Sequence, residues 1–81
     1  MNLVFGIEDV RNLPITRDRE IMSGAPVFKG TRVPIDALWN NLASGSSLDV
    51  FLDNFPSVRR EDAVRLLDFA NRSMAALAYA A

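Results

Sequence analysis

Residues 24–34 read GAPVFKGTRVP, and this stretch decides the fold of the first half of the chain. Gly24 can adopt a positive φ at no steric cost, and Pro26 has no amide hydrogen to give to a ladder, so the chain should turn here. Lys29-Gly30 is a turn candidate between two short runs that favour β structure. The pattern therefore predicts a β-hairpin. The predicted strands are 27–28 and 31–33.

Two helices are expected after this hairpin. Pro34 suits the first turn of a helix, and apolar residues at i, i+3, i+4 and i+7 predict a helix over 35–43 that ends at Ser44-Gly45. Ser46 or Ser47 then caps a second helix, which Pro56 ends. Their apolar stripes are Ile35, Leu38, Trp39 and Leu42, and Leu48, Phe51, Leu52 and Phe55.

A third helix is expected to begin around Arg59 and to run towards the C-terminus. Ser57 is its candidate N-cap, and Glu61 and Asp62 complement the helix dipole in its first turn. One face of it is apolar. The residues of this face are Ala63, Leu66, Leu67, Ala70, Met74 and Leu77. The alanine-rich tail favours continuation of this helix, although alanine side chains bury little area.

Composition limits the function classes. The chain has 81 residues and is 49% hydrophobic, so its core is small and oligomerisation would help it. Because it has no cysteine and no histidine, it lacks the commonest metal ligands and the commonest general base. Its carboxylate clusters, Glu61-Asp62 and Asp49 with Asp53, offer only two possible metal ligands each. We therefore expect no metal site, no cofactor and no enzymatic activity.

The charge and the hydropathy of the chain suggest a location and weigh on its partners. The N-terminus lacks a signal-peptide pattern, and no apolar run is long enough to span a bilayer, so a cytoplasmic protein without a membrane segment is expected. The net charge is −1, which argues against a strong lone DNA binder. The segment of the third helix is less acidic than the part of the chain that precedes it.

The hairpin segment and the order of the motifs after it carry a family resemblance. The segment GAPVFKGTRVP, the turn at 43–45, the Phe55-Pro56 pair and Glu61-Asp62 at a helix start occur in a fixed order. Over roughly residues 15–70 the chain resembles domain-of-unknown-function family 433, whose members look like VapB-type antitoxins. The resemblance implies a winged or homeodomain-like helix-turn-helix protein, in some cases paired with a PIN-type ribonuclease toxin.

A helix-turn-helix interpretation assigns DNA contacts to the start of the third helix. Residues there would face the major groove, and a lysine in the hairpin turn could touch a phosphate as part of a wing. The predicted contact residues are Arg59, Arg60, Val64, Arg65 and Lys29. The alternative is a three-helix core with solvated arginines, in which the lysine only solvates the turn.

Other residues are assigned structural roles. Arg32 is expected to brace the hairpin by binding a carboxylate or backbone carbonyls, because its planar fork can join two elements. Trp39 and Phe51 lie on apolar stripes, so core packing is favoured over a ligand platform. The predicted structural motif consists of Gly24, Pro26, Gly30, Thr31, Arg32 and Pro34.

Together these observations predict a small α+β domain, mainly α. It has a three-helix, helix-turn-helix-like core at 15–81, an N-terminal β-hairpin within this range, and an arm at 1–14 that can pair as a strand. The function implied by the resemblance is that of an antitoxin that binds its operator as a homodimer and neutralises a PIN-type toxin. The alternative is a dimerising protein-interaction module that does not bind DNA.

Overall fold

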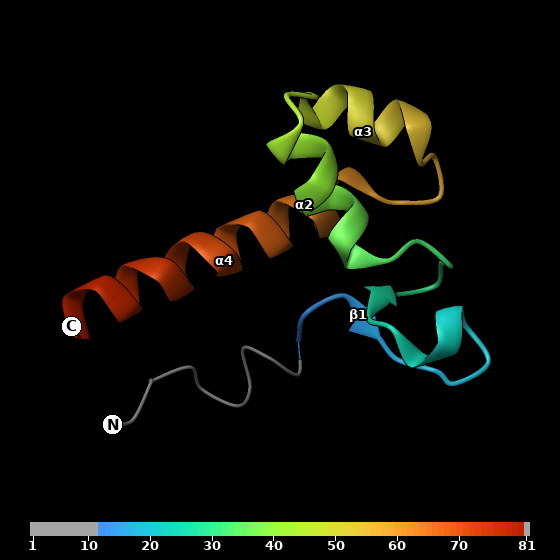
Figure 1. The fold of residues 1–81 in the computed structure, drawn as a ribbon, viewed down its shortest axis with the longest axis horizontal. Helices are drawn as coiled ribbons and strands as arrows, with labels where there is room; N and C mark the ends of the chain where they lie inside the picture. The colour runs from blue at the N-terminus through green and yellow to red at the C-terminus, as the bar shows by residue number, and fades with distance from the viewer. Residues whose placement is uncertain (1–11, 81) are drawn as a thin grey trace.

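Three helices and a two-stranded antiparallel hairpin make up the described part of the protein. The structure, a computed structural model, describes residues 12–80. Its elements are β1 (Ile15–Thr16), the 3-10 helix η1 (Met22–Gly24), β2 (Val27–Phe28), α2 (Ile35–Ala43), α3 (Leu48–Asn54) and α4 (Arg60–Ala80). The first half of α4 lies beside α2, whereas its second half extends away from the other elements (Figure 1). The predicted fold class, mainly helical α+β, is confirmed.

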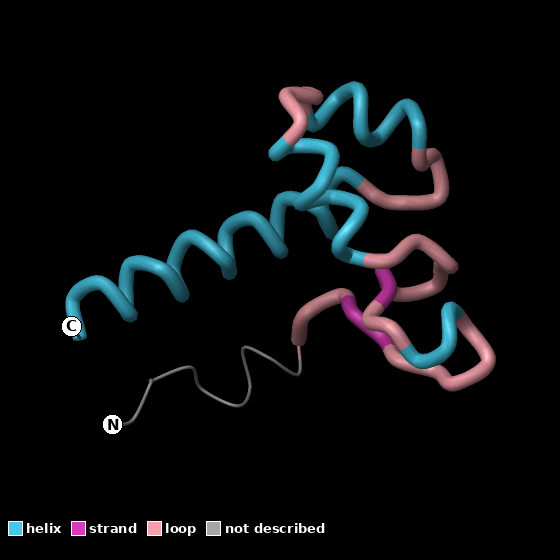
Figure 2. The backbone as a smooth tube through the Cα atoms, in the orientation of Figure 1, coloured by secondary structure: helices cyan, strands magenta, loops and turns pink. Residues whose placement is uncertain are grey.

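The pairing within the hairpin differs from the prediction. β2 pairs antiparallel with β1, with Ile15 opposite Phe28 and Thr16 opposite Val27, so residues 31–33 are not its partner strand (Figure 2). The predicted turn does close, because the Phe28 amide donates to the Val33 carbonyl at 2.9 Å. The chain nevertheless bends at residues 31–32 and forms no strand there, because the Thr31 side chain bonds to the backbone on both sides of itself.

The connection between β1 and β2 contains three successive positive φ angles. Met22, Ser23 and Gly24 have φ values of 50°, 57° and 87°. Only glycine adopts this region without cost. The Arg17 guanidinium donates to the Gly24 carbonyl at 2.9 Å and holds the loop closed. The turn expected at Gly24 is therefore present.

The helix boundaries follow local capping chemistry. α2 ends in a Schellman motif, in which the Ser46 amide donates to the Asn41 carbonyl and Gly45 has a φ of 98°. The Ser47 side chain caps α3 by accepting from the Val50 amide at 3.1 Å. At α4 the carbonyl of Arg59 accepts the first helical bonds, so Arg59, and not the expected Ser57, occupies the N-cap position.

The core lies where the three helices meet the hairpin. Its fully buried aromatic residues are Phe28 and Phe51, whose ring centroids are 6.2 Å apart. The buried cluster consists of Phe28, Leu38, Phe51, Val58, Ala63 and Leu66. Trp39 is half-buried and packs against this cluster, so its expected core role holds at the edge of the core and not at its centre.

Candidate functional site: a basic pocket at the start of α4

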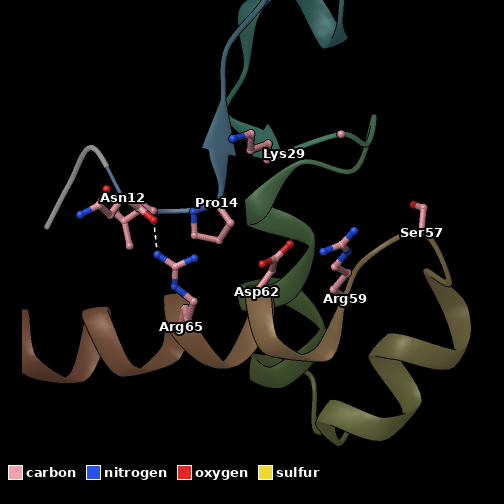
Figure 3. Close-up of a pocket in the computed structure, with 9 residues that line it drawn as sticks. Asn12, Pro14, Lys29, Ser57, Arg59, Asp62 and Arg65 are labelled. Atoms are coloured by element: carbon pink, nitrogen blue, oxygen red, sulfur yellow. Dashed lines mark hydrogen bonds between the residues drawn. The ribbon is translucent and has the colours of Figure 1, made fainter. Parts of the chain in front are cut away.

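An open pocket of about 600 Å³ lies at the N-terminal end of α4 (Figure 3). Three segments that are distant in the sequence form its walls: the chain just before β1, the turn after β2, and the start of α4. Its lining residues are Asn12, Leu13, Pro14, Lys29, Gly30, Ser57, Arg59, Asp62 and Arg65. The pocket thus joins the hairpin to the third helix, and it contains three of the five residues predicted to contact DNA.

Backbone geometry positions each of the three basic side chains. The Lys29 amide donates to the Pro14 carbonyl at 2.8 Å, and Gly30 turns the chain with a φ of 76°. Arg59 is placed by the N-cap of α4. Arg65 lies further along the helix, where its guanidinium donates to the backbone carbonyl of Asn12. The cations therefore stand on backbone that is fixed by hydrogen bonds.

The pocket is electropositive although the chain as a whole is slightly acidic. Three cations and the one carboxylate, Asp62, give its lining a formal charge of 3 − 1 = +2, against −1 for the chain. Among residues 12–80 the ion pairs join Arg60 to Asp49 and Arg72 to Asp68, and none involves the three cations of the pocket. The dipole of α4 adds partial positive charge at this end. An anion is the ligand that this arrangement favours.

The other two predicted DNA contacts lie on a different face of α4. Arg60 forms an ion pair with Asp49 of α3. Val64 is 46% exposed and, four residues after Arg60, shares its side of the helix. Asp62 and Arg65 are related by three residues and share the side that lines the pocket. The structure therefore separates the predicted set into Lys29, Arg59 and Arg65 on one side and Arg60 and Val64 on another.

The turn that follows β2 is braced by a residue other than the one expected to brace the hairpin. Thr31 Oγ1 donates to the Phe28 carbonyl at 2.8 Å and accepts from the Val33 amide at 3.0 Å. Arg32 is exposed, and no hydrogen bond or ion pair joins it to another of residues 12–80. The hydroxyl of Thr31 reaches both sides of the bend because the bend is only a few residues wide. The bracing role predicted for Arg32 is thus corrected to Thr31.

The remaining members of the structural motif lie in the loop before β2 and in the segment between β2 and α2. Gly24 and Gly30 both have positive φ values. Pro26 precedes β2, and its carbonyl accepts a hydrogen bond from the Ile35 amide at 3.0 Å. Pro34 occupies the N-cap position of α2 and forms a bridge with Val27. These residues set the position of the Lys29-Gly30 turn at the pocket.

Sequence reasoning missed the wall of the pocket that is formed by residues 12–14. These residues were assigned to an arm at 1–14, of which 1–11 lie outside the described residues. Pro14 is buried, and the carbonyl of Asn12 accepts a hydrogen bond from Arg65 of α4, which is 53 residues away in the sequence. The one available signal was Pro14 itself, which fixes φ just before a strand.

A second, apolar depression lies next to the pocket, further along α4, and Leu13 lines both of them. This apolar groove has a volume of about 330 Å³. Its lining residues are Leu13, Ile15, Ile35, Trp39, Leu66, Phe69, Ala70, Ser73 and Met74. Because almost all of these side chains are apolar, the groove suits a hydrophobic partner surface and not a charged ligand.

Two further features of the described residues bear on the class of the protein. Within residues 12–80, no three or more acidic, histidine or cysteine side chains gather where they could hold a metal ion. None of the described helices combines the length and the apolar character that crossing a bilayer requires.

These features define the class: a small, mainly helical α+β domain in which a hairpin and three helices enclose one core. Residues 15–70 match the model of a family described as "Protein of unknown function (DUF433)", and the chain belongs to this family. The match includes the whole hairpin, α2, α3 and the first half of α4. No curated protein and no solved structure matches the chain.

Proposed function

We propose that the protein is an antitoxin-like DNA-binding protein that binds its operator as a homodimer and neutralises a PIN-type ribonuclease. The observation that supports DNA binding is the convergence of Lys29, Arg59 and Arg65 on one open pocket. Phosphate oxygens are the anions that lysine, arginine and a helix N-terminus bind in nucleic-acid complexes. In this proposal α3 and α4 form the helix-turn-helix pair, and the Lys29 turn acts as the wing.

The mechanism follows from the charge distribution. Because one copy offers three cations in the pocket, two copies acting together give the affinity that one copy lacks at physiological salt. The phosphate backbone would enter the pocket, and the exposed side of α4 that carries Val64 would face the bases. The carboxylate of Asp62, which also lines the pocket, repels a bound phosphate. Binding should therefore be electrostatic, local to this end of the molecule and sensitive to salt.

The experiment is a set of single charge changes measured with the protein's own upstream DNA. Arg59→Gln should weaken the mobility shift, and Asp62→Asn should strengthen it, because each change acts on the pocket with opposite sign. Arg72→Gln is the matched control, since Arg72 lies on the same helix, outside the pocket and paired with Asp68. Equal effects of Arg59→Gln and Arg72→Gln would mean that only net charge matters. That result would contradict a built site.

The toxin partner is part of the proposal through the family resemblance. Co-expression with a neighbouring gene for a PIN-type nuclease, followed by pull-down and growth rescue, tests it directly. Rescue of growth together with a stable complex supports the antitoxin role. If a complex forms but growth is not rescued, the protein binds the nuclease without neutralising it.

A second candidate function is that of a protein-interaction module that does not bind DNA. The apolar groove and the net charge of −1 favour it. If the parent protein fails to shift its upstream DNA even at low salt, this candidate takes precedence.

A further inference from the structure

The second half of α4 has no described neighbour for most of its length. α4 has 21 residues; Ser73 and Met74 still line the apolar groove, and the C-terminal end of the helix extends away from α2, α3 and the hairpin (Figure 1). A helical segment of about ten residues is marginal on its own in water, because helix stability comes chiefly from packing of an apolar face. Met74 and Leu77 are nevertheless 66% and 40% exposed on it. This part of the helix therefore presents an apolar surface that lacks a partner within the described chain.

This surface continues the apolar groove along one side of the helix. Ala70, Ser73, Met74 and Leu77 follow one another at i, i+3, i+4 and i+7. The first three of them line the groove, and Leu77 lies one turn beyond it. We call these four residues the α4 ridge. Each chain therefore carries both a groove and an apolar ridge that leads out of it.

The polar groups near the ridge are already satisfied. The Ser73 hydroxyl donates to the Phe69 carbonyl at 2.7 Å, so it can be covered without loss of a hydrogen bond. The nearest charged pair, Asp68 and Arg72, is joined at 3.1 Å on the opposite side of the helix. Because the ridge is uncharged, two identical copies of it do not repel one another.

We infer that the groove is occupied by the α4 ridge of a second copy of this chain, in an antiparallel pair of α4 helices. Two-fold symmetry places Ser73 of both copies near the axis, where the small side chains of Ala70 and Ser73 allow close approach. Leu77 of each copy then lies over Phe69 and Trp39 of the other. The proposed operator binding requires a dimer but specifies no interface. This inference supplies one, and it holds whether or not DNA is bound.

Sedimentation equilibrium of the full chain without DNA tests the interface. The parent should change from twice the chain mass of 9.0 kDa to that mass on dilution. Met74→Glu and Leu77→Glu should each raise the dissociation constant by about 100-fold, because a carboxylate would be buried without a partner. The helical circular dichroism of the diluted, monomeric parent should match theirs, since both side chains are exposed in one copy.

Tyr79→Glu is the control for these variants. Tyr79 is 94% exposed and lies about 140° around the helix from Met74, so it is outside the ridge. Its variant should dimerise like the parent. A parent that is monomeric at every concentration would overturn the inference. Equal weakening by all three glutamates would overturn it as well.

The absence of cysteine allows a second test, of the helix direction. Under mild oxidation Ser73→Cys should form a disulfide-linked dimer, because the two sites meet near the axis. Leu77→Cys should not link to itself, since two sites four residues from the axis are separated by eight residues, or about 12 Å along the helices. Disulfide formation requires Cα atoms within about 7 Å. Efficient self-linkage of Leu77→Cys would mean parallel helices and would overturn the antiparallel arrangement.

Discussion

Arg60, the first residue of α4, forms an ion pair with Asp49 in the first turn of α3. The two side chains are 58% and 74% exposed, so solvent screens their attraction and the pair contributes little to stability. The pair marks the direction of Arg60, which lies on the side of α4 next to α3 and not on the side where its neighbour Arg59 lines the pocket. Two adjacent arginines in the sequence therefore have different surroundings.

The first prediction separates these two arginines. Arg59→Gln should weaken operator binding and reduce the slope of log affinity against log salt by about 1.8 in magnitude, the contribution of two phosphate contacts, one from each copy of the dimer. Arg60→Gln should leave the slope unchanged, since Arg60 lies outside the pocket. Fluorescence anisotropy over a salt series measures both slopes. A larger loss for Arg60→Gln would assign the DNA face to the Arg60 and Val64 side of α4.

The second prediction concerns two aromatic residues of unequal burial. Phe51→Ala should lower the free energy of unfolding by about 3–5 kcal/mol, because Phe51 is fully buried between Phe28 and Phe55. Trp39→Ala should cost less, because Trp39 is only half-buried at the edge of the core. Urea unfolding at a fixed protein concentration measures which of the two variants loses more free energy of unfolding. A greater loss for Trp39→Ala would mean that the groove contributes more to stability than the core does.

Helix positions could be predicted from the sequence because their signals are local. The α2 boundaries, Ile35–Ala43, follow from an apolar period between Pro34 and Gly45, and the bounds of α3 follow from Ser47 and Pro56. Both signals lie within one turn of the residues that they affect. The fold class could be predicted from the same helical spacing of apolar residues and from the glycines that predict the turns.

The strand pairing and the pocket could not be predicted, because they depend on contacts between distant residues. Val27–Phe28 forms its strand pair with Ile15–Thr16, whereas its contact with the other flank is limited to one hydrogen bond to Val33 and a bridge to Pro34, because the Thr31 side chain bends the chain there. The bond from Arg65 to the Asn12 carbonyl spans 53 residues and involves a backbone atom, for which no side-chain pattern exists. The separation of Arg59 from Arg60 depends likewise on the ion pair with α3.

The third prediction tests the brace of the hairpin. Thr31→Val keeps the shape of the side chain but removes both hydroxyl hydrogen bonds, and it should cost about 1–3 kcal/mol because the site is partly buried. Arg32→Gln should change the free energy of unfolding by less than about 0.5 kcal/mol, as for other exposed substitutions. Thermal melts at matched concentrations compare the two variants. If Arg32→Gln proved the more damaging, the brace would have to be assigned to Arg32 after all.

The fourth prediction uses Trp39, the only tryptophan of the chain, as a probe of the proposed dimer. Trp39 lines the apolar groove, so a second copy seated there would remove water from its indole ring. Dilution of the parent should therefore move the fluorescence emission maximum to longer wavelength, with the midpoint found by sedimentation. Leu77→Glu should show the long-wavelength maximum at every concentration, and Tyr79→Glu should follow the parent. An emission maximum that stays constant while the mass changes would mean that the chains associate through a surface other than this groove.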